Sequence, residues 1–219
     1  MAGLRRRPIV CYVTGGIPLA SAGAIEGLLE NMRAAIAAGA DWVQIRERNL
    51  PARELLAFAR AAVRMSGNFA RVIVNDRLDI AVAARAAGVH LGVESLPARE
   101  VVSWHRGGNA PADFFVGVSC HSVEEVREAE AAGASYVVFG PVFETPSKKN
   151  FGPPQGLAKL AEVCRSVAVP VIAIGGVNEK NSADCVRAGA AGIAAIRMFQ
   201  EQREAEELRR SIEQLHRLG

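Results

Sequence analysis

The segment Ala-Ala-Gly-Ala-Asp-Trp-Val-Gln-Ile at residues 37–45 returns in altered form at 86–91, 131–139 and 187–193 of the 219-residue chain. Each copy has the pattern of a helix end, a glycine and then an apolar strand. The copies begin 45 to 56 residues apart, which is the length of two strand–helix units. Glycine tolerates the left-handed conformation that ends a helix, so we expect that conformation at Gly39, Gly88, Gly133 and Gly189.

Outward from these repeats, short β-branched runs alternate with amphipathic segments and no linker interrupts them. We expect strands at 8–14, 42–47, 71–75, 89–91, 114–118, 136–139, 170–174 and 192–196. We expect helices near 21–38, 51–66, 78–87, 97–106, 122–132, 156–167, 180–188 and 201–218. Eight strand–helix pairs predict a single-domain α/β protein, a (β/α)8 TIM barrel over residues 1–219. An open doubly wound sheet is the alternative, but it usually has only about five or six strands.

The composition excludes several classes of protein. Half of the residues are hydrophobic and 22% are charged, which is typical of a globular chain. The 26 basic and 23 acidic residues are interspersed and only 5% of residues are aromatic, so we expect no nucleic-acid partner. No apolar run approaches the roughly 18 residues of a membrane span, and the run at 8–13 is too short for a signal peptide. We therefore expect a cytoplasmic protein with no membrane partner.

The cysteines and the helix faces are less informative. None of the four cysteines forms a Cys-x-x-Cys pair, so we expect reduced thiols rather than disulfides or structural zinc. Barrels of this size are often homodimers, but no apolar helix face in the sequence is specific enough to decide the oligomeric state.

In such a barrel the ligand site lies at the carboxyl ends of the strands. Polar and glycine residues gather there: Gln44, Arg46 and Arg48 after the second strand, Asn75 and Asp76 after the third, Glu94 and Ser95 after the fourth, Ser119 and His121 after the fifth, Thr145, Ser147 and Lys148 after the sixth, and Gly175 and Gly176 after the seventh. Arginines, lysines, hydroxyls and bare backbone together predict an anionic ligand.

Gly175 and Gly176 are candidates for phosphate binding. Barrels often hold a phosphate between the loops after strands 7 and 8, where glycines let backbone N–H groups approach its oxygens. The alternative is a tight turn without a ligand. The loop at 142–156 is longer than usual, so it is either functional, with hydroxyl and ammonium groups closing over a phosphorylated substrate, or a solvated polar loop.

Charged residues near the second and third strands have two explanations each. Arg46 and Arg48 alternate with Glu47, which predicts that both arginines point to one side of the strand and Glu47 to the other. An arginine in a barrel mouth favours ligand binding, and a salt bridge to Asp76 is the alternative. Asp76 either binds magnesium or caps a helix, with Glu94 or Ser95 as its only nearby partners for a metal.

His121, beside Ser119, is the best-placed general acid or base. No third residue that would orient a Ser–His nucleophilic pair is evident in the sequence. His90 lies in an apolar run, and we expect it to be structural.

Six ordered motifs between about residues 8 and 200 resemble the thiamine phosphate synthase/TenI family. They are Gln-Ile-Arg-Glu-Arg (44–48), Val-Asn-Asp-Arg (74–77), Gly-Val-His-Leu-Gly (88–92), Gly-Val-Ser-Cys-His-Ser (117–122), Phe-Gly-Pro-Val-Phe-Glu-Thr-Pro-Ser-Lys-Lys (139–149) and Ala-Ile-Gly-Gly-Val (173–177). The resemblance implies a (β/α)8 barrel that acts on a phosphorylated thiazole in thiamine biosynthesis. The family's synthases join a pyrimidine methyl diphosphate to thiazole phosphate with the aid of Mg2+. Its TenI branch includes a thiazole tautomerase, which aromatises thiazole carboxylate phosphate by moving a proton and requires no cofactor.

The resemblance assigns a role to each matching position. Gln44 matches a residue near the pyrimidine, Arg46 a diphosphate ligand, and Asn75 and Asp76 the diphosphate and metal positions. Arg48 stands where synthases usually have lysine. Ser119, Thr145 and Lys148 match site residues, Ser147 replaces a usual threonine, and Gly175 and Gly176 match the thiazole-phosphate site.

One departure from the synthase pattern concerns the metal. A Gly-Gln-Glu-Asp-like segment should supply the second metal carboxylate, but here it reads Gly92-Val93-Glu94-Ser95, so Ser95 replaces the aspartate. Glu94 substitutes only if the loop shifts by about one residue. Losing a carboxylate weakens magnesium binding, because few protein ligands hold that ion.

This departure favours a TenI-type tautomerase in which His121 moves the proton and Ser119 or Lys148 stabilises the carboxylate. The alternative is a magnesium-dependent synthase, which Asn75-Asp76 and Gly140-Pro141-Val142 favour. A second alternative is a non-catalytic regulatory protein that binds thiazole phosphate.

Overall fold

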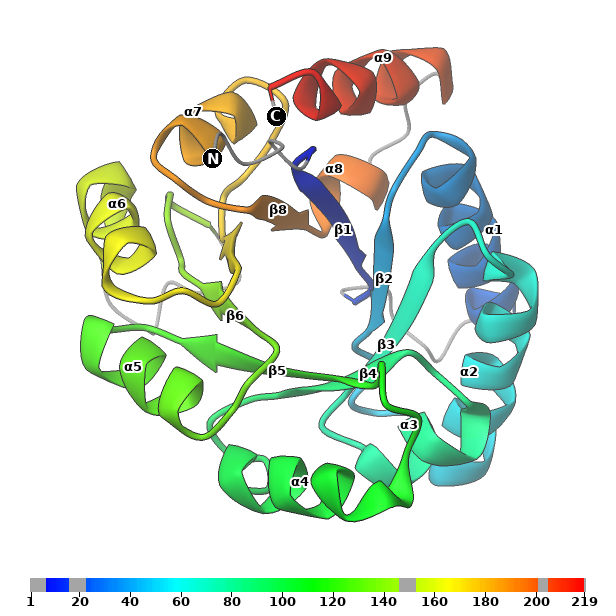
Figure 1. The fold of residues 1–219 in the computed structure, drawn as a ribbon. Helices are drawn as coiled ribbons and strands as arrows, with labels where there is room; N and C mark the ends of the chain where they lie inside the picture. The colour runs from blue at the N-terminus through cyan, green and yellow to red at the C-terminus, as the bar shows by residue number, and fades with distance from the viewer. Residues whose placement is uncertain (1–6, 16–22, 146–152, 201–204, 219) are drawn as a thin grey trace.

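Eight parallel strands close into a barrel with the helices outside it (Figure 1). The structure, a computed structural model, describes residues 7–15, 23–145, 153–200 and 205–218. The strands pair in chain order, and β1 pairs with β8 to close the barrel. The predicted TIM barrel is therefore confirmed, and the open doubly wound sheet is excluded.

The strands agree with the predicted runs to within one or two residues at most ends. They are β1 (Ile9–Val13), β2 (Trp42–Ile45), β3 (Arg71–Asn75), β4 (Gly88–Leu91), β5 (Phe115–Cys120), β6 (Tyr136–Phe139), β7 (Val171–Ile174) and β8 (Gly192–Ala195). These runs are apolar because a strand in a barrel is covered on both faces, by the interior and by the outer helices.

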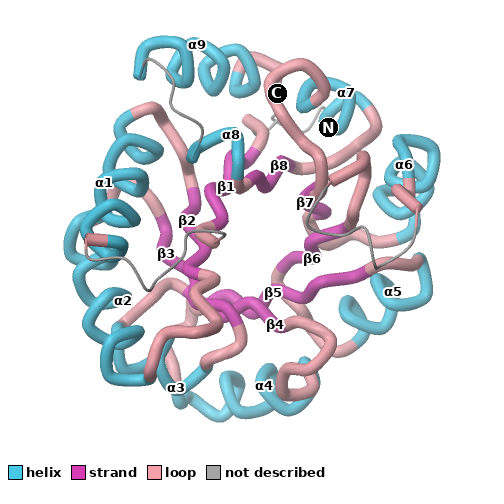
Figure 2. The backbone as a smooth tube through the Cα atoms, turned by 180° about the vertical axis from the view of Figure 1, so that it is seen from behind, coloured by secondary structure: helices cyan, strands magenta, loops and turns pink. Residues whose placement is uncertain are grey.

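Helices form a ring around the strands, which Figure 2 shows from behind. They are α1 (Ala24–Ala37), α2 (Ala52–Ser66), α3 (Leu78–Ala84), α4 (Ala98–Trp104), the π-helical turn η1 (His105–Asn109), α5 (Val123–Ala131), α6 (Gly156–Ser166), α7 (Ser182–Arg187), α8 (Arg197–Gln200) and α9 (Ala205–His216). The sequence did not predict the short α8. No helix in the described ranges is long and apolar enough to cross a membrane.

Apolar side chains form two separate clusters, because alternate residues of a strand point to opposite faces. The larger cluster lies between the strands and the helices and includes Val43, Val74 and Phe58 of α2. The smaller one fills the barrel interior and includes Trp42, Ile73, Tyr136 and Ile172. The interior is thus a packed core, and the ligand site is confined to the barrel's ends.

The repeat glycines behave as predicted at three positions of four. Gly39, Gly133 and Gly189 have φ of 107°, 91° and 105°. The prediction for Gly88 was wrong, because Arg85 takes the left-handed conformation that ends α3 and Gly88 is the first residue of β4. A Cβ atom at Gly88 would lie 2.4 Å from the Phe115 carbonyl oxygen, so this glycine allows two strands to approach closely.

Asp41, just before β2, joins the two ends of the described chain. Its carboxylate pairs with Arg7, accepts a hydrogen bond from Val10 N at 2.9 Å, and lies 3.0 Å from His216 Nε2. The Asp41 carboxylate therefore contacts both β1 and α9 at the amino end of the barrel.

Candidate functional site

The carboxyl ends of β2 and β3 carry a chain of polar side chains that faces the barrel mouth. Gln44 and Asn75 are buried. Gln44 Nε2 donates to Asn75 Oδ1 at 3.0 Å, and Asn75 Nδ2 in turn donates to Asp76 Oδ2. These two bonds fix the orientation of both amides and direct them toward the Asp76 carboxylate.

Asp76 is held in an unusual conformation at the end of β3. Its φ is 61°, in the left-handed region that residues other than glycine seldom adopt and in which aspartate and asparagine are enriched. Its Oδ1 accepts a hydrogen bond from the Ser95 hydroxyl, and Gly92 N lies 3.4 Å from the same oxygen. The loop after β4 is therefore hydrogen-bonded to the Asp76 carboxylate through the Ser95 side chain.

A cavity of about 230 Å3 lies beside Asp76. Its polar lining includes Asn75, Asp76, Arg48, Glu47 and Glu94. Arg48 is 57% exposed, and its Nε lies 4.0 Å from Asp76 Oδ2. The salt bridge considered as the alternative for the arginines therefore forms at Arg48, at the outer limit of an ion pair.

Arg46 and Glu47 differ from Arg48 in burial. Arg46 is half-buried, and its pKa is lowered mainly by that burial and secondly by the charge of Arg48. Glu47 is buried, which raises its pKa, and its Oε1 has no hydrogen-bond partner among the described residues. Arg46 thus brings a poorly solvated positive charge to the mouth, as an anion site requires.

Ser119 contacts His90, and not the nearby His121 with which the sequence analysis had considered a nucleophilic pair. Its Oγ lies 2.8 Å from His90 Nε2, and His90 Nδ1 lies 3.2 Å from Tyr136 Oη. Burial lowers the pKa of His90 to about 4 and raises that of Tyr136 well above its usual value. The sequence analysis missed this contact, although alternation along β4 places His90 on the interior face, opposite to the helix-facing Val89 and Leu91.

His121 follows β5 and is half-buried. Its Nδ1 contacts the Gly140 carbonyl oxygen, and its backbone N donates to Glu125 Oε2 at 2.6 Å. Ser122 caps α5 by accepting from Glu125 N at 3.1 Å. Because a carbonyl oxygen only accepts, this contact requires a hydrogen on Nδ1 of His121.

Gly175 and Gly176 make a turn on which the loop after β6 packs. Their φ values are 93° and 67°. A Cβ atom would lie 2.5 Å from Pro141 Cα at the first position and 2.5 Å from the Glu144 carbonyl oxygen at the second. Phe143 N donates to Gly175 O at 2.9 Å. The tight-turn explanation is therefore correct for the backbone, and it is compatible with phosphate binding.

Two asparagines shape the backbone that follows this turn. Asn178 N donates to Asn181 Oδ1 at 2.8 Å, and Asn181 Nδ2 donates to Gly176 O at 3.0 Å. Within the described residues, the backbone N–H groups of Gly176 and Val177 have no hydrogen-bond acceptor. Donors of this kind at a glycine turn are what a phosphate group binds.

Three of the predicted site residues lie in the loop after β6. Thr145 is half-buried and is the last residue before 146–152. Ser147 and Lys148 fall outside the described residues, so their roles remain predictions.

The described side chains include no group of three or more His, Cys, Asp or Glu residues that could hold a metal ion. Asp76 lies at the end of β3, and two more carboxylates line the same cavity, the buried Glu47 and the exposed Glu94. Magnesium commonly binds one or two carboxylates and completes its shell with waters and substrate phosphates. The residues present therefore fit a magnesium ion shared with a phosphorylated substrate and do not form a cage of protein ligands.

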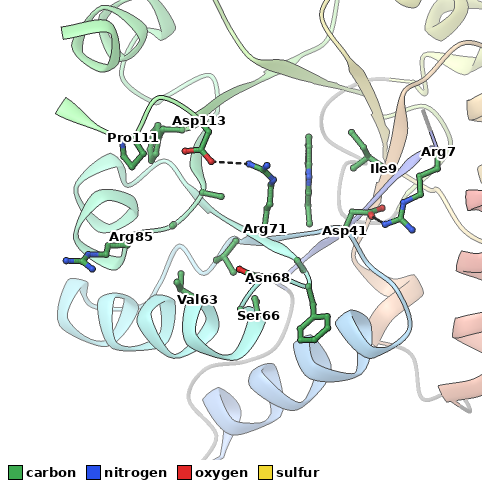
Figure 3. A pocket seen from close by; sticks show the side chains of 18 residues that line it. Arg7, Ile9, Asp41, Val63, Ser66, Asn68, Arg71, Arg85, Pro111 and Asp113 are labelled. Atoms are coloured by element: carbon green, nitrogen blue, oxygen red, sulfur yellow. Dashed lines mark hydrogen bonds and ion pairs between the residues drawn. The ribbon is translucent and has the colours of Figure 1, made fainter. Parts of the chain in front are cut away.

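A larger cavity, of about 740 Å3, lies at the opposite end of the barrel (Figure 3). Its lining includes Ile9, Trp42 and Arg71, the first residues of β1, β2 and β3. Arg71 pairs with Asp113 at 3.8 Å across it. None of the predicted site residues lines it. In TIM barrels the amino end serves stability and the carboxyl end serves catalysis, so the smaller cavity is the candidate site.

The sequence matches the model of a known family over most of its length. The family is described as thiamine monophosphate synthase, and the match covers residues 10–199. A putative thiamine-phosphate synthase of Geobacter sulfurreducens is 42% identical over 170 residues, which are 77% of this chain and 78% of that protein. A thiamine-phosphate synthase of Roseiflexus sp. is 38% identical over 180 residues, covering 77% and 70% of the two chains.

Solved structures agree with this match. The thiamine phosphate pyrophosphorylase of Pyrococcus furiosus superposes with a TM-score of 0.79 at 31% identity, over 97% of this chain and 99% of that one. A structure titled native KDPGal superposes with a TM-score of 0.69 at 20% identity, which shows a shared barrel fold alone.

Proposed function

Because the chain belongs to the thiamine monophosphate synthase family, we propose that it is a thiamine-phosphate synthase. In this reaction a pyrimidine methyl diphosphate and thiazole phosphate combine and diphosphate is released. The observation that carries the proposal is the synthase name of relatives about 40% identical over three quarters of this chain. These relatives favour the alternative of the sequence analysis over the tautomerase that it preferred.

The diphosphate group is assigned to the arginine side of the mouth. Arg46 is half-buried there, and Arg48 contacts Asp76 across the cavity. A guanidinium binds phosphate oxygens through paired N–H donors, so it suits a diphosphate. Asn75, whose amide is oriented by Gln44, lies between these charges and the barrel interior. Gln44 matches the family's residue near the pyrimidine, so the pyrimidine ring is assigned to the part of the mouth beside it.

Magnesium is the cofactor that this reaction calls for. Asp76 would hold it, with the substrate's phosphates and waters as the other ligands. When bound, the ion neutralises charge on the departing diphosphate. The chain's own contribution at this point is Ser95, which anchors the Asp76 carboxylate through a hydrogen bond.

Thiazole phosphate is assigned to the turn after β7. Its phosphate would accept hydrogen bonds from the N–H groups of Gly176 and Val177, which have no other acceptor in the described part of the chain. In this assignment the thiazole would lie across the mouth from Arg46. The pyrimidine methylene then loses its bond to the diphosphate oxygen and gains a bond to the thiazole, so the protein's task is to position two anionic substrates.

The test is formation of thiamine phosphate by the purified protein from both substrates, with and without Mg2+. We expect magnesium-dependent product, and Asp76→Asn should reduce it by at least about 100-fold, the usual cost of losing a group that stabilises the transition state. Absence of product beside an active synthase control would contradict the proposal. Proton transfer on thiazole carboxylate phosphate, lost in His121→Gln, would then identify the tautomerase.

A further inference from the structure

We propose that Tyr136 and His90 form a hydrogen-bond relay that fixes the Ser119 hydroxyl as a donor to an anionic oxygen of the substrate. The relay spans β6, β4 and β5. The relay rests on the proposed function for one point, the identification of the ligand as a diphosphate. Tyr136 and His90 act as positioning residues, and Ser119 is the group that touches the ligand.

The geometry of the relay is closely constrained. His90 and Tyr136 are each 2% exposed. His90 Nδ1 lies 3.2 Å from Tyr136 Oη, and His90 Nε2 lies 2.8 Å from Ser119 Oγ. The two rings are stacked, with centroids 5.7 Å apart and an interplanar angle of 30°. Each imidazole nitrogen therefore faces one hydroxyl group.

Tyr136 is held rigidly enough to set the direction of these bonds. Its ring packs against Trp42, with centroids 4.9 Å apart. It also occupies the space beside Gly117 on the neighbouring strand, where a Cβ atom would lie 2.1 Å from Tyr136 Cζ. Gly117 thus makes room for the phenol, and the packing prevents the hydroxyl from turning to another partner.

The phenol proton decides which nitrogen of His90 carries hydrogen. Among the described residues, His90 Nδ1 is the only hydrogen-bond partner of Tyr136 Oη. The buried phenol must donate its proton or leave it unpaired, and an unpaired buried donor is costly. Tyr136 therefore donates to Nδ1, and a neutral imidazole then carries its hydrogen on Nε2.

The state of Ser119 follows from this assignment. Nε2–H donates to Ser119 Oγ, so the hydroxyl proton cannot point back to His90. Ser119 is half-buried at the carboxyl end of β5, and His90 is its one side-chain partner in the described ranges. Its proton is consequently directed to the mouth, where the positive charge of Arg46 favours an anionic ligand.

The opposite assignment would reverse the role of Ser119. Hydrogen on Nδ1 would donate to Tyr136 Oη and leave the phenol proton without an acceptor. Ser119 would then donate to Nε2 and present only its lone pairs to an anion, which repels them. The relay therefore has two possible hydrogen-bond directions, and the phenol proton of Tyr136 selects one of them.

The first measurement needs no variant. Nitrogen-15 NMR of the imidazole side chains in the full-length protein at neutral pH reports which nitrogen of His90 carries hydrogen. We expect hydrogen on Nε2 in the wild type, and a mixture of the two tautomers in Tyr136→Phe, where no phenol proton makes Nδ1 the acceptor. Hydrogen on Nδ1 in the wild type would overturn the relay.

The second measurement is the Kd for inorganic diphosphate with Mg2+. Ser119→Ala should weaken binding by about tenfold, the loss of one hydrogen bond to a charged group. Tyr136→Phe should weaken it by a smaller factor, above about twofold, because the Ser119 hydroxyl is then free to point either to His90 or to the ligand. The double variant should bind no more weakly than Ser119→Ala, because Tyr136 acts only through Ser119. Additive losses would overturn the relay, as would unchanged binding by Tyr136→Phe.

The chain's other tyrosine is a matched control. Tyr12 is fully buried, and its Oη accepts from Gln200 Nε2 at 3.2 Å on the helix-facing side of β1. Tyr12→Phe also removes a buried phenol hydroxyl, and it should leave the Kd for diphosphate within about twofold of the wild-type value. Thiamine phosphate formation by the wild type is measured separately. If it fails while the tautomer and the coupled diphosphate losses persist, the synthase proposal falls and the relay stands.

Discussion

Ser95 donates its hydroxyl proton to Oδ1 of Asp76, and so joins the loop after β4 to the end of β3. The sequence analysis identified Ser95 as standing where the family pattern has a second metal carboxylate. The structure places the Ser95 side chain in direct contact with Asp76. Where the family pattern has two carboxylates, this protein therefore has one carboxylate and a hydroxyl that donates to it. We therefore expect this exchange to stabilise the site in the absence of a cation.

Ser95→Asp should therefore make the protein depend on magnesium for stability. Without Mg2+ the new carboxylate faces Asp76, and we expect the free energy of unfolding to fall by about 1–3 kcal/mol, because a like charge replaces a hydrogen bond. Adding Mg2+ should restore it. Thermal unfolding with and without Mg2+ measures both effects.

Ser95→Asn is the matched control, since it has the shape of aspartate without the charge. Its unfolding temperature should respond to Mg2+ no more than that of the wild type. Equal magnesium responses in the aspartate and asparagine variants would show that position 95 does not share a cation site with Asp76.

Gly176→Ala should weaken the packing between the loops after β6 and β7. The backbone has φ of 67°, and the new methyl would lie 2.5 Å from the Glu144 carbonyl oxygen. We expect a loss of about 1–3 kcal/mol in the free energy of unfolding, measured by urea titration. Gly27→Ala in α1 is the control, because its Cβ would contact nothing within 4 Å and alanine favours a helix. A Gly176→Ala protein as stable as Gly27→Ala would contradict the role given to this turn.

Glu47→Gln should stabilise the protein at neutral pH. Burial raises the pKa of Glu47 in the folded state, so the neutral carboxyl is the favoured form there. That contribution to stability is present below the unfolded value near 4.5 and is lost as pH rises through the folded pKa. Glutamine stays neutral, so at pH 7 the variant should gain up to about 1 kcal/mol.

The difference between Glu47→Gln and wild type should shrink as pH falls toward 4, where the wild-type carboxyl is also neutral. Urea titrations at both pH values test this. Exposed Glu30→Gln controls for the loss of one negative charge, with an expected change within about 0.5 kcal/mol at either pH. A gain for Glu47→Gln that is equal at pH 4 and pH 7 would disprove the burial argument.

Asp41→Ala should destabilise the barrel without affecting its mouth. The variant loses the acceptor of Val10 N and the contacts with Arg7 and His216, and we expect about 2 kcal/mol of lost stability. Asp113→Ala, which removes one exposed ion pair at the same end of the barrel, should cost less than about 0.5 kcal/mol. Neither should alter the Kd for diphosphate. Weaker diphosphate binding by Asp41→Ala would mean that the two ends of the barrel are coupled.

The sequence predicted which residues gather at the candidate site but not which of them contact one another. Polar residues at strand ends, such as Arg46 and Asp76, could be found because the barrel directs every strand's carboxyl end to one face. Their contacts could not be found in the same way. Ser119 lies two residues from His121 in the sequence and 29 residues from His90, yet it bonds His90. That bond depends on how β4 and β5 are aligned, which no local pattern encodes.

The sequence by itself determined the number and order of the strands and the main helix that follows each of them, and it predicted the face proposed for ligands, but it gave neither α8 nor η1. Periodicity and helix-ending glycines are properties of short segments, so they can be recognised without knowing which other segments pack beside them. Tertiary structure alone decided that Gly88 serves strand packing, that Ser95 bonds Asp76, and that His90 lies between Tyr136 and Ser119. These are relations between strands, and they are set by the register and stagger with which the barrel closes.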